Sequence, residues 1–199
     1  MTDLAHGVTR FEHDVFPGKA ALFADLATTH TPHTLFIGCS DARVVPELIT
    51  SSEPGELFVI RTAGNLVPAY APGGDGIAAS IEYAVAVLGV ARIIVCGHSG
   101  CGAMTAVAER HDLSAMPTIA QWLRHSDAAA ARAGALGATD PVAGLVRANV
   151  VAQLSHLATH PAVARALVTG ALDLEGWVFD IASGAVTVLR DGAEDSPAA

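Results

Sequence analysis

The sequence predicts an α/β protein with a three-layer α-β-α arrangement around a central, mostly parallel β-sheet. A helical N-terminal arm and C-terminal antiparallel strands complete the expected fold. Between residues 33 and 111, short apolar segments alternate with helix-type patterns, an order typical of parallel sheets. Apolar residues make up 51% of the 199 residues and charged residues 16%, so the chain can bury a large core. One domain of this class is therefore expected.

The N-terminal half supplies the arm and the first strands. Residues 1–30 carry helical apolar spacing, which Pro17 and Gly18 are expected to interrupt. Three segments are apolar on both faces, as strands inside a parallel sheet are: 33–38, 56–61 and 91–97. Asp75 is expected to cap a helix whose apolar residues recur as far as Leu88. These elements begin a single domain, expected to span 31–190.

The C-terminal half is predicted to be helical and then to return to strands. Asp140 and Pro141 are typical of a helix N-terminus. The segment 172–189 alternates in hydropathy around Ser183-Gly184 and is expected to form two strands joined by a turn. The polar tail, 191–199, is expected to be disordered.

Charge and cysteine content limit the possible partners. The net charge is −9 and Lys19 is the one lysine, which disfavours binding to nucleic acid. No apolar stretch reaches the roughly 18–20 residues that span a bilayer, and no secretory signal pattern is seen. No membrane association and a cytoplasmic location are therefore expected. Three cysteines in such a chain indicate thiols or metal ligands, not a disulfide framework.

Two of these cysteines follow predicted strands, where α/β proteins bind their ligands. Cys39 ends the first strand, and His98 and Cys101 follow the third. Two thiolates and an imidazole suit Zn²⁺, and three protein ligands leave one position open, as in catalytic sites. The alternative is that each residue is ordinary core, since H-x-x-C often occurs by chance. Cys96 lies inside a strand and is interpreted as core.

Asp41 and Arg43 follow Cys39 closely and suggest a reason for the open position. A carboxylate near Zn²⁺ is a natural fourth ligand, but a bidentate arginine holds it away. Asp41 can then accept a hydrogen bond from hydroxide on the metal. The alternative is a surface ion pair that contributes little stability.

The motifs "CSDAR" (39–43) and "GHSGCGAM" (97–104) resemble those of the β-class carbonic anhydrases, as do the segments 56–68, 80–90 and 174–181. The likeness extends from about residue 10 to 190 and is greatest to soluble bacterial and carboxysome-associated members. It implies that Zn²⁺ is held by Cys39, His98 and Cys101, with Asp41 and Arg43 as the catalytic dyad. The implied reaction is the reversible hydration of CO₂ to bicarbonate and a proton, through zinc-bound hydroxide oriented by the dyad.

The resemblance also implies residues around the substrate and a partner subunit. The Gly102 N–H is expected to contact the substrate, and Tyr70 matches a residue that walls the CO₂ pocket in a dimer. A homodimer or a dimer-based tetramer is expected, and carboxysome association is an additional possibility for location. His30 stands where many relatives have a glutamine, and it is expected to bind substrate or to move protons. The alternative is an ordinary solvated histidine in a Thr-rich loop.

One anion site of a family subclass is altered in this chain. Its Trp, Arg and Tyr correspond here to Phe36, Arg61 and Phe179, so regulation by bicarbonate is not expected. Two alternative functions stay open at this point: a CS₂ or COS hydrolase on the same scaffold, and a non-catalytic zinc-binding scaffold protein. A redox function for Cys96 and Cys101 is disfavoured, because their spacing differs from C-x-x-C.

Overall fold

The computed structural model of the chain describes residues 3–189 and 196–197. The chain divides into two compact units, Met1–Thr31 and Pro32–Ala199, whose relative placement is not determined. Most of the predicted tail, 191–199, lies outside the described residues. The described helices are all too short or too polar to cross a membrane.

The first unit is helical and consists of α1 (Leu4–Arg10), a π-helical turn η1 (Phe11–Val15) and α2 (Phe16–Leu26). Pro17 does not interrupt the helix, contrary to the sequence prediction, because it occupies the first turn of α2. Proline lacks an N–H and its ring crowds the preceding turn. The wider π turn just before it, closed by a hydrogen bond from Phe16 N to Phe11 O, accommodates this ring.

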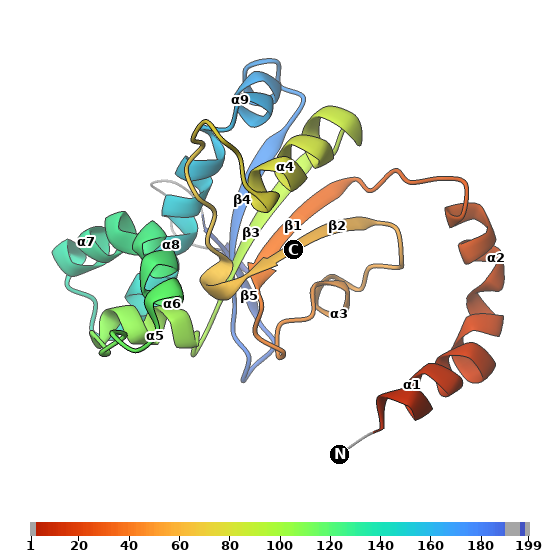
Figure 1. The fold of residues 1–199 in the computed structure, drawn as a ribbon, viewed down its shortest axis with the longest axis horizontal. Helices are drawn as coiled ribbons and strands as arrows, with labels where there is room; N and C mark the ends of the chain where they lie inside the picture. Colours follow the sequence, from red (N-terminus) through yellow and green to blue (C-terminus); the bar gives the residue numbers. More distant parts are fainter. Residues whose placement is uncertain (1–2, 190–195, 198–199) are drawn as a thin grey trace. The chain divides into compact units, whose positions relative to one another are not determined.

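The second unit is built on a sheet with strand order β2-β1-β3-β4-β5-β6 (Figure 1). The strands are β1 (Thr34–Cys39), β2 (Leu57–Thr62), β3 (Arg92–His98), β4 (Asp173–Phe179), β5 (Val186–Leu189) and β6 (Ser196–Pro197). The first four in spatial order run parallel, and β5 and β6 are added antiparallel. The predicted fold class is confirmed: flanking helices surround a mostly parallel sheet.

The helices of the second unit lie in the connections between β1, β2, β3 and β4, together with several short turns. They are α3 (Pro46–Thr50), α4 (Gly76–Glu82), α5 (Gly102–Ala108), α6 (Pro117–Leu123), α7 (Asp127–Leu136), α8 (Pro141–Leu157) and α9 (Pro161–Val168). Short turns η2 (Ala63–Asn65), η3 (Tyr83–Val87) and η4 (Arg124–Ser126) lie between them. The Asp75 and Asp140 side chains cap α4 and α8 as predicted. Helix α3 was not anticipated.

Helix α8 packs directly on the central strands because two glycines let it approach. A Cβ at Gly97 of β3 would lie 2.9 Å from Val150 Cγ2, and one at Gly176 of β4 would lie 2.8 Å from Val150 Cγ1. One buried cluster joins Leu35 and Val95 of the sheet to residues of α8 and α9. This packing fixes the carboxyl ends of β1 and β3, where the predicted ligands lie.

Candidate active site

Cys39, His98 and Cys101 converge at the carboxyl ends of two neighbouring strands. Cys39 is the last residue of β1 and His98 the last of β3, and these strands pair in parallel. Cys101 follows directly, just before α5. Their ligand atoms all lie within 4.8 Å of one another, and the residues are 6%, 0% and 1% exposed. The expected convergence of side chains 59 residues apart is therefore present.

The imidazole of His98 is oriented as a metal ligand would be. Its Nδ1 lies 3.0 Å from Ser99 O and donates to that carbonyl, which leaves Nε2 as the free lone pair. Nε2 is buried and has no hydrogen-bond partner within 3–189 and 196–197. A buried polar atom without a partner is costly. Burial lowers the pKa of His98, but the nearby Cys39 sulfur and the hydrogen bond to Ser99 O raise it overall.

The two thiols are coupled through one proton. The hydrogen bond from Cys101 lowers the pKa of Cys39 to about 4, with smaller contributions from His98 and from backbone groups. Cys101 keeps its proton, so that bond and burial raise its own pKa. Gly64 N also donates to Cys39 Sγ at 3.4 Å. Loss of the one proton that the pair shares would give two thiolates. Two thiolates with an imidazole fit Zn²⁺.

Cys96 takes no part in this cluster. It is fully buried within β3, and burial raises the pKa of its thiol to about 12. It packs with Phe36 and Ile94 on one face of the sheet. Its interpretation as core is consistent with these contacts.

Asp41 and Arg43 form a bidentate pair beside the cluster. Arg43 donates from Nε to Oδ1 at 2.9 Å and from Nη2 to Oδ2 at 2.7 Å, and its backbone N–H reaches Oδ1 at 3.0 Å. These bonds hold the pKa of Asp41 well below its usual range. Arg43 Nη2 also reaches Gly100 O at 3.2 Å. Asp41 Oδ2 lies 3.9 Å from His98 Nε2, so an ionised carboxylate stands next to the ligand atoms.

Arg61 supports the segment that carries Cys39 and Asp41, a role the sequence did not indicate. Its Nε donates to Cys39 O at 3.0 Å, and its Nη2 donates to Asp41 O at 2.6 Å and Val44 O at 2.7 Å. Three main-chain carbonyls thus engage Arg61, the residue that the family resemblance matched to an anion site. Phe36 is buried nearby in the sheet.

A second support comes from polar residues of α8, which sequence reasoning also missed. Asn149 Nδ2 donates to Gly64 O at 3.0 Å, and Gln153 Nε2 donates to Asn149 Oδ1 at 2.9 Å. Gln153 Oε1 accepts from Val67 N at 2.8 Å. Both side chains are fully buried. A signal was available: an i, i+4 pair of amides on an otherwise apolar helix face.

Three further predicted site residues, Gly102, Tyr70 and His30, are not among the three ligand residues or the Asp41–Arg43 pair. Gly102 is the first residue of α5, directly after Cys101. Tyr70 is 45% exposed, and its ring centroid lies 5.8 Å from that of His160. His30 belongs to the first unit, so its distance from the cluster is undefined. The roles of these three residues stay predictions.

The sequence model of the family described as "Carbonic anhydrase" matches residues 34–186. The chain belongs to the carbonic anhydrase family. It is 55% identical to the carbonic anhydrase of Pseudomonas aeruginosa over 196 residues, covering 97% of this chain and 89% of that protein. It is 50% identical to carbonic anhydrase 1 of Escherichia coli O157:H7, with the same coverage.

Solved structures place the chain in the β class of carbonic anhydrases. The β-carbonic anhydrase CcaA matches with a TM-score of 0.89 at 39% identity, covering 94% of each chain. The Coccomyxa β-carbonic anhydrase in complex with acetazolamide matches with a TM-score of 0.83 at 28% identity, covering 95% of this chain and 87% of that one. As a carbonic anhydrase the chain is a lyase with zinc as its cofactor, and the suspected family is confirmed.

Proposed function

We propose that Cys39, His98 and Cys101 hold the zinc ion, and that Asp41 and Arg43 act with it in the reversible hydration of CO₂ to bicarbonate and a proton. The observation that carries the proposal is the position of a bidentate Asp41–Arg43 pair beside three buried ligand atoms that lie within 4.8 Å of one another. When bound, zinc acidifies a water so that hydroxide is available near neutral pH, as is established for carbonic anhydrases.

Arg43 determines what Asp41 can do. Because it donates to both carboxylate oxygens, it keeps Asp41 ionised and engages both of its oxygens. Asp41 is then an acceptor and not a fourth ligand, so the position for the nucleophile stays open. A hydrogen bond from hydroxide to Asp41 Oδ2 would direct an oxygen lone pair toward CO₂. Arg43 itself is anchored to Gly100 O, next to Cys101.

Three further residues are proposed to contact or serve the substrate. The Gly102 N–H follows the ligand Cys101 at the start of α5 and is suited to hydrogen-bond a substrate oxygen. The exposed Tyr70 ring is proposed to wall the CO₂ site of a second subunit. His30 is proposed to hydrogen-bond bicarbonate or to carry the product proton toward solvent.

A homodimer, or a tetramer made of dimers, is the proposed assembly. The first unit exposes apolar side chains that a second copy would cover, among them Leu4 at 84% and Val8 at 57%. One chain from the structures described as two tetrameric β-carbonic anhydrases of Sordaria macrospora matches this chain with a TM-score of 0.80 at 28% identity, covering 98% of this chain and 100% of that one. Sedimentation of the full chain and of a chain lacking 1–30 tests this assembly. The shortened chain is expected to form an assembly with fewer subunits.

The catalytic proposal is tested with Asp41→Asn, which keeps the side-chain shape and removes the charge. Elemental analysis is expected to find zinc retained, while stopped-flow CO₂ hydration falls by about 10²–10⁴-fold, the usual contribution of such a group. Cys101→Ser is expected to lose the metal. The control is Asp112→Asn, because Asp112 is an exposed acid that caps the backbone at Ser114. Normal turnover by Asp41→Asn would exclude Asp41 from the mechanism.

A further inference from the structure

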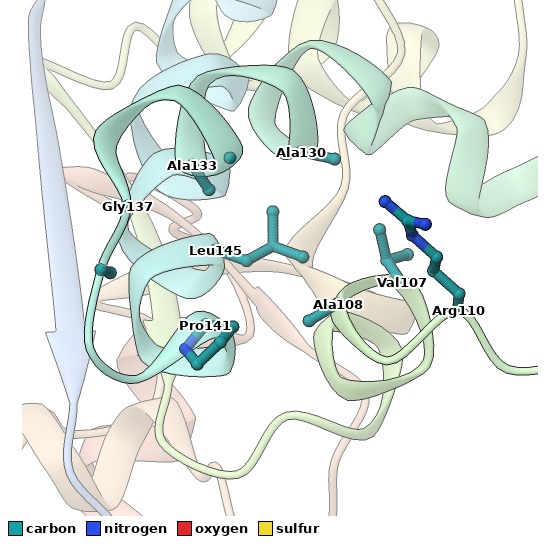
Figure 2. A pocket seen from close by; sticks show the side chains of 10 residues that line it. Val107, Ala108, Arg110, Ala130, Ala133, Gly137, Pro141 and Leu145 are labelled. Atoms are coloured by element: carbon teal, nitrogen blue, oxygen red, sulfur yellow. The ribbon is translucent and has the colours of Figure 1, made fainter.

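A cavity lies among α5, α7 and α8, away from the candidate active site (Figure 2). None of the proposed zinc ligands or dyad residues lines it. Its volume is about 320 Å³, at the lower end of the range for small-molecule sites. Its principal lining side chains are Val107, Ala108, Arg110, Ala130, Ala133 and Leu145. Figure 2 shows Leu145 pointing into the middle of the space between α7 and α5.

The lining is apolar except at one end. Small side chains of α7 face the Leu145 and Pro141 side chains of α8 across the cavity (Figure 2). Arg110, which follows α5, is the one charged residue in the lining. An apolar space with a single cation at its edge has the composition of a site for a small amphiphilic anion.

The acids that could neutralise Arg110 are engaged elsewhere. Glu109 Oε2 pairs with His111 Nε2 at 2.9 Å. Asp112 Oδ1 accepts from Ser114 N at 2.9 Å. Within the described part of the chain, the Arg110 guanidinium forms no ion pair. Arg110 is exposed at the edge of the cavity, so its guanidinium is accessible to an anion from solvent.

The backbone at the cavity does not require a donor from a ligand. Ala106 O accepts from His111 N at 2.9 Å and Val107 O from Arg110 N at 3.2 Å, at the end of α5. Ala133 O accepts from Gly137 N at 3.2 Å, at the end of α7. These three carbonyls are satisfied. Arg110 can still donate to a ligand, and the partner of that donation is an acceptor.

We propose that this cavity binds a small carboxylate with a compact apolar body, such as an aromatic or short branched acid. The carboxylate would pair with the Arg110 guanidinium, and the apolar body would contact Leu145, Val107 and Ala133. Arg–carboxylate pairs are bidentate and stronger than neutral hydrogen bonds. Leu145 shares an apolar cluster with Cys101, so an occupied cavity lies one packing layer from the proposed zinc ligands.

The test uses the zinc-loaded full chain with ¹³C-labelled methyl groups and benzoate as the probe. Benzoate is expected to shift the Leu145 and Val107 methyl resonances saturably, whereas benzyl alcohol, which has no charge, and acetate, which has no apolar body, are expected to bind at least tenfold more weakly. This readout does not depend on CO₂ hydration, so it can fail while the proposed function holds. Benzoate bound at zinc would be insensitive to changes at Arg110 and Ala133, which distinguishes it from benzoate bound in the cavity.

Two pairs of variants make the test specific. Arg110→Asn removes the charge at a backbone φ of 54°, which asparagine adopts more readily than most residues, and is expected to weaken benzoate at least tenfold. Arg110→Lys keeps the charge but not the bidentate pair, and it is expected to bind benzoate with an affinity between those of wild type and Arg110→Asn. Ala133→Leu fills the cavity and is expected to abolish the shift. Ala135→Leu, on the exposed side of the same helix, is expected to leave it unchanged.

Three results would overturn the proposal. The first is a Leu145 shift that survives both Arg110→Asn and Ala133→Leu. The second is equal affinity for benzoate and benzyl alcohol. The third is no shift at all, and a change in sedimentation of Ala133→Leu would then show that a second copy covers the cavity.

Discussion

Replacing Asn149 by alanine tests whether α8 supports the candidate zinc site through the turn after β2. Asn149 is fully buried, and its Nδ2 donates to Gly64 O at 3.0 Å. The turn is tight, with Gly64 at φ +74°, and the Gly64 N–H reaches Cys39 Sγ at 3.4 Å. Loss of the amide therefore removes a restraint on Gly64, the residue whose N–H contacts the proposed ligand.

The expected destabilisation follows from two costs. Gly64 O loses its side-chain donor while buried, which costs about 1–3 kcal/mol. The truncated side chain leaves a void that costs about 1 kcal/mol more. Gln153 Nε2 keeps its second acceptor, His125 O at 3.3 Å, so it adds no further penalty. The sum is about 2–4 kcal/mol, which lowers the Tm of a chain of this length by about 4–16 °C.

The assay is thermal unfolding of zinc-loaded protein at fixed concentration, with zinc affinity measured by competition against a chelator. Groups that orient metal ligands typically contribute about 10–100-fold to metal affinity, and a loss near the lower figure is expected. Ser155→Ala is the control, because Ser155 is an exposed residue of α8 that bonds only its own helix at Val151 O. Unchanged stability of Asn149→Ala would refute the reasoning, as would weakened zinc binding without any destabilisation.

Three further predictions follow from local geometry. Gly97→Ala places a Cβ 2.9 Å from Val150 Cγ2, and this overpacking is expected to lower the free energy of unfolding by about 1–3 kcal/mol, measured in urea. The pKa of Asp180 is lowered, first by the hydroxyl of Ser183. Its stabilisation is therefore present above the unfolded pKa of about 4 and lost as pH falls through the lower folded value, so Asp180→Asn is expected to approach wild-type stability in acid. The Arg61 guanidinium already donates to three carbonyls and is therefore not expected to bind regulatory bicarbonate. The pH–rate profile of CO₂ hydration is expected to stay simple when bicarbonate is added.

Each of these has a control or a contradicting result. Gly102→Ala meets no atom within 4 Å and is expected to keep full stability; an equally stable Gly97→Ala would contradict the packing argument. Glu82→Gln changes an exposed acid of α4 and serves as the control for Asp180→Asn. If the stability difference between wild type and Asp180→Asn grows on acidification, the assigned direction of the pKa is wrong. A steeply sigmoidal, bicarbonate-dependent profile would contradict the third prediction.

The strands and the ligand cluster were predictable from the sequence because few patterns compete with them. The runs 33–38, 56–61 and 91–97 differ from the observed strands by one residue at each end, since segments apolar on both faces fit only a buried parallel strand. Convergence of Cys39 and His98 followed from adjacency of the strands they end. Which strands lie next to each other is determined by the tertiary structure, and there β1 pairs with β3.

The elements that were missed depend on contacts that no local pattern encodes. Pro17 is typical of a helix break, but a π turn that ends two residues earlier, at Val15, accommodates its ring. Asn149 lies in a helix that otherwise reads as apolar, and its partner, Gly64, is 85 residues away. The Arg61 side chain lies on β2 but serves backbone carbonyls at the end of β1. Sequence gives the residue types, whereas the register between elements determines which backbone groups they meet.

These unanticipated contacts hold Cys39 from two directions. On one side Arg61 takes the carbonyls of Cys39, Asp41 and Val44, which leaves the segment few ways to rearrange. On the other side the Gly64 N–H, positioned through Asn149, contacts the Cys39 sulfur itself. The two supports act at different atoms: the first engages the main chain that carries Cys39 and Asp41, and the second contacts the Cys39 sulfur.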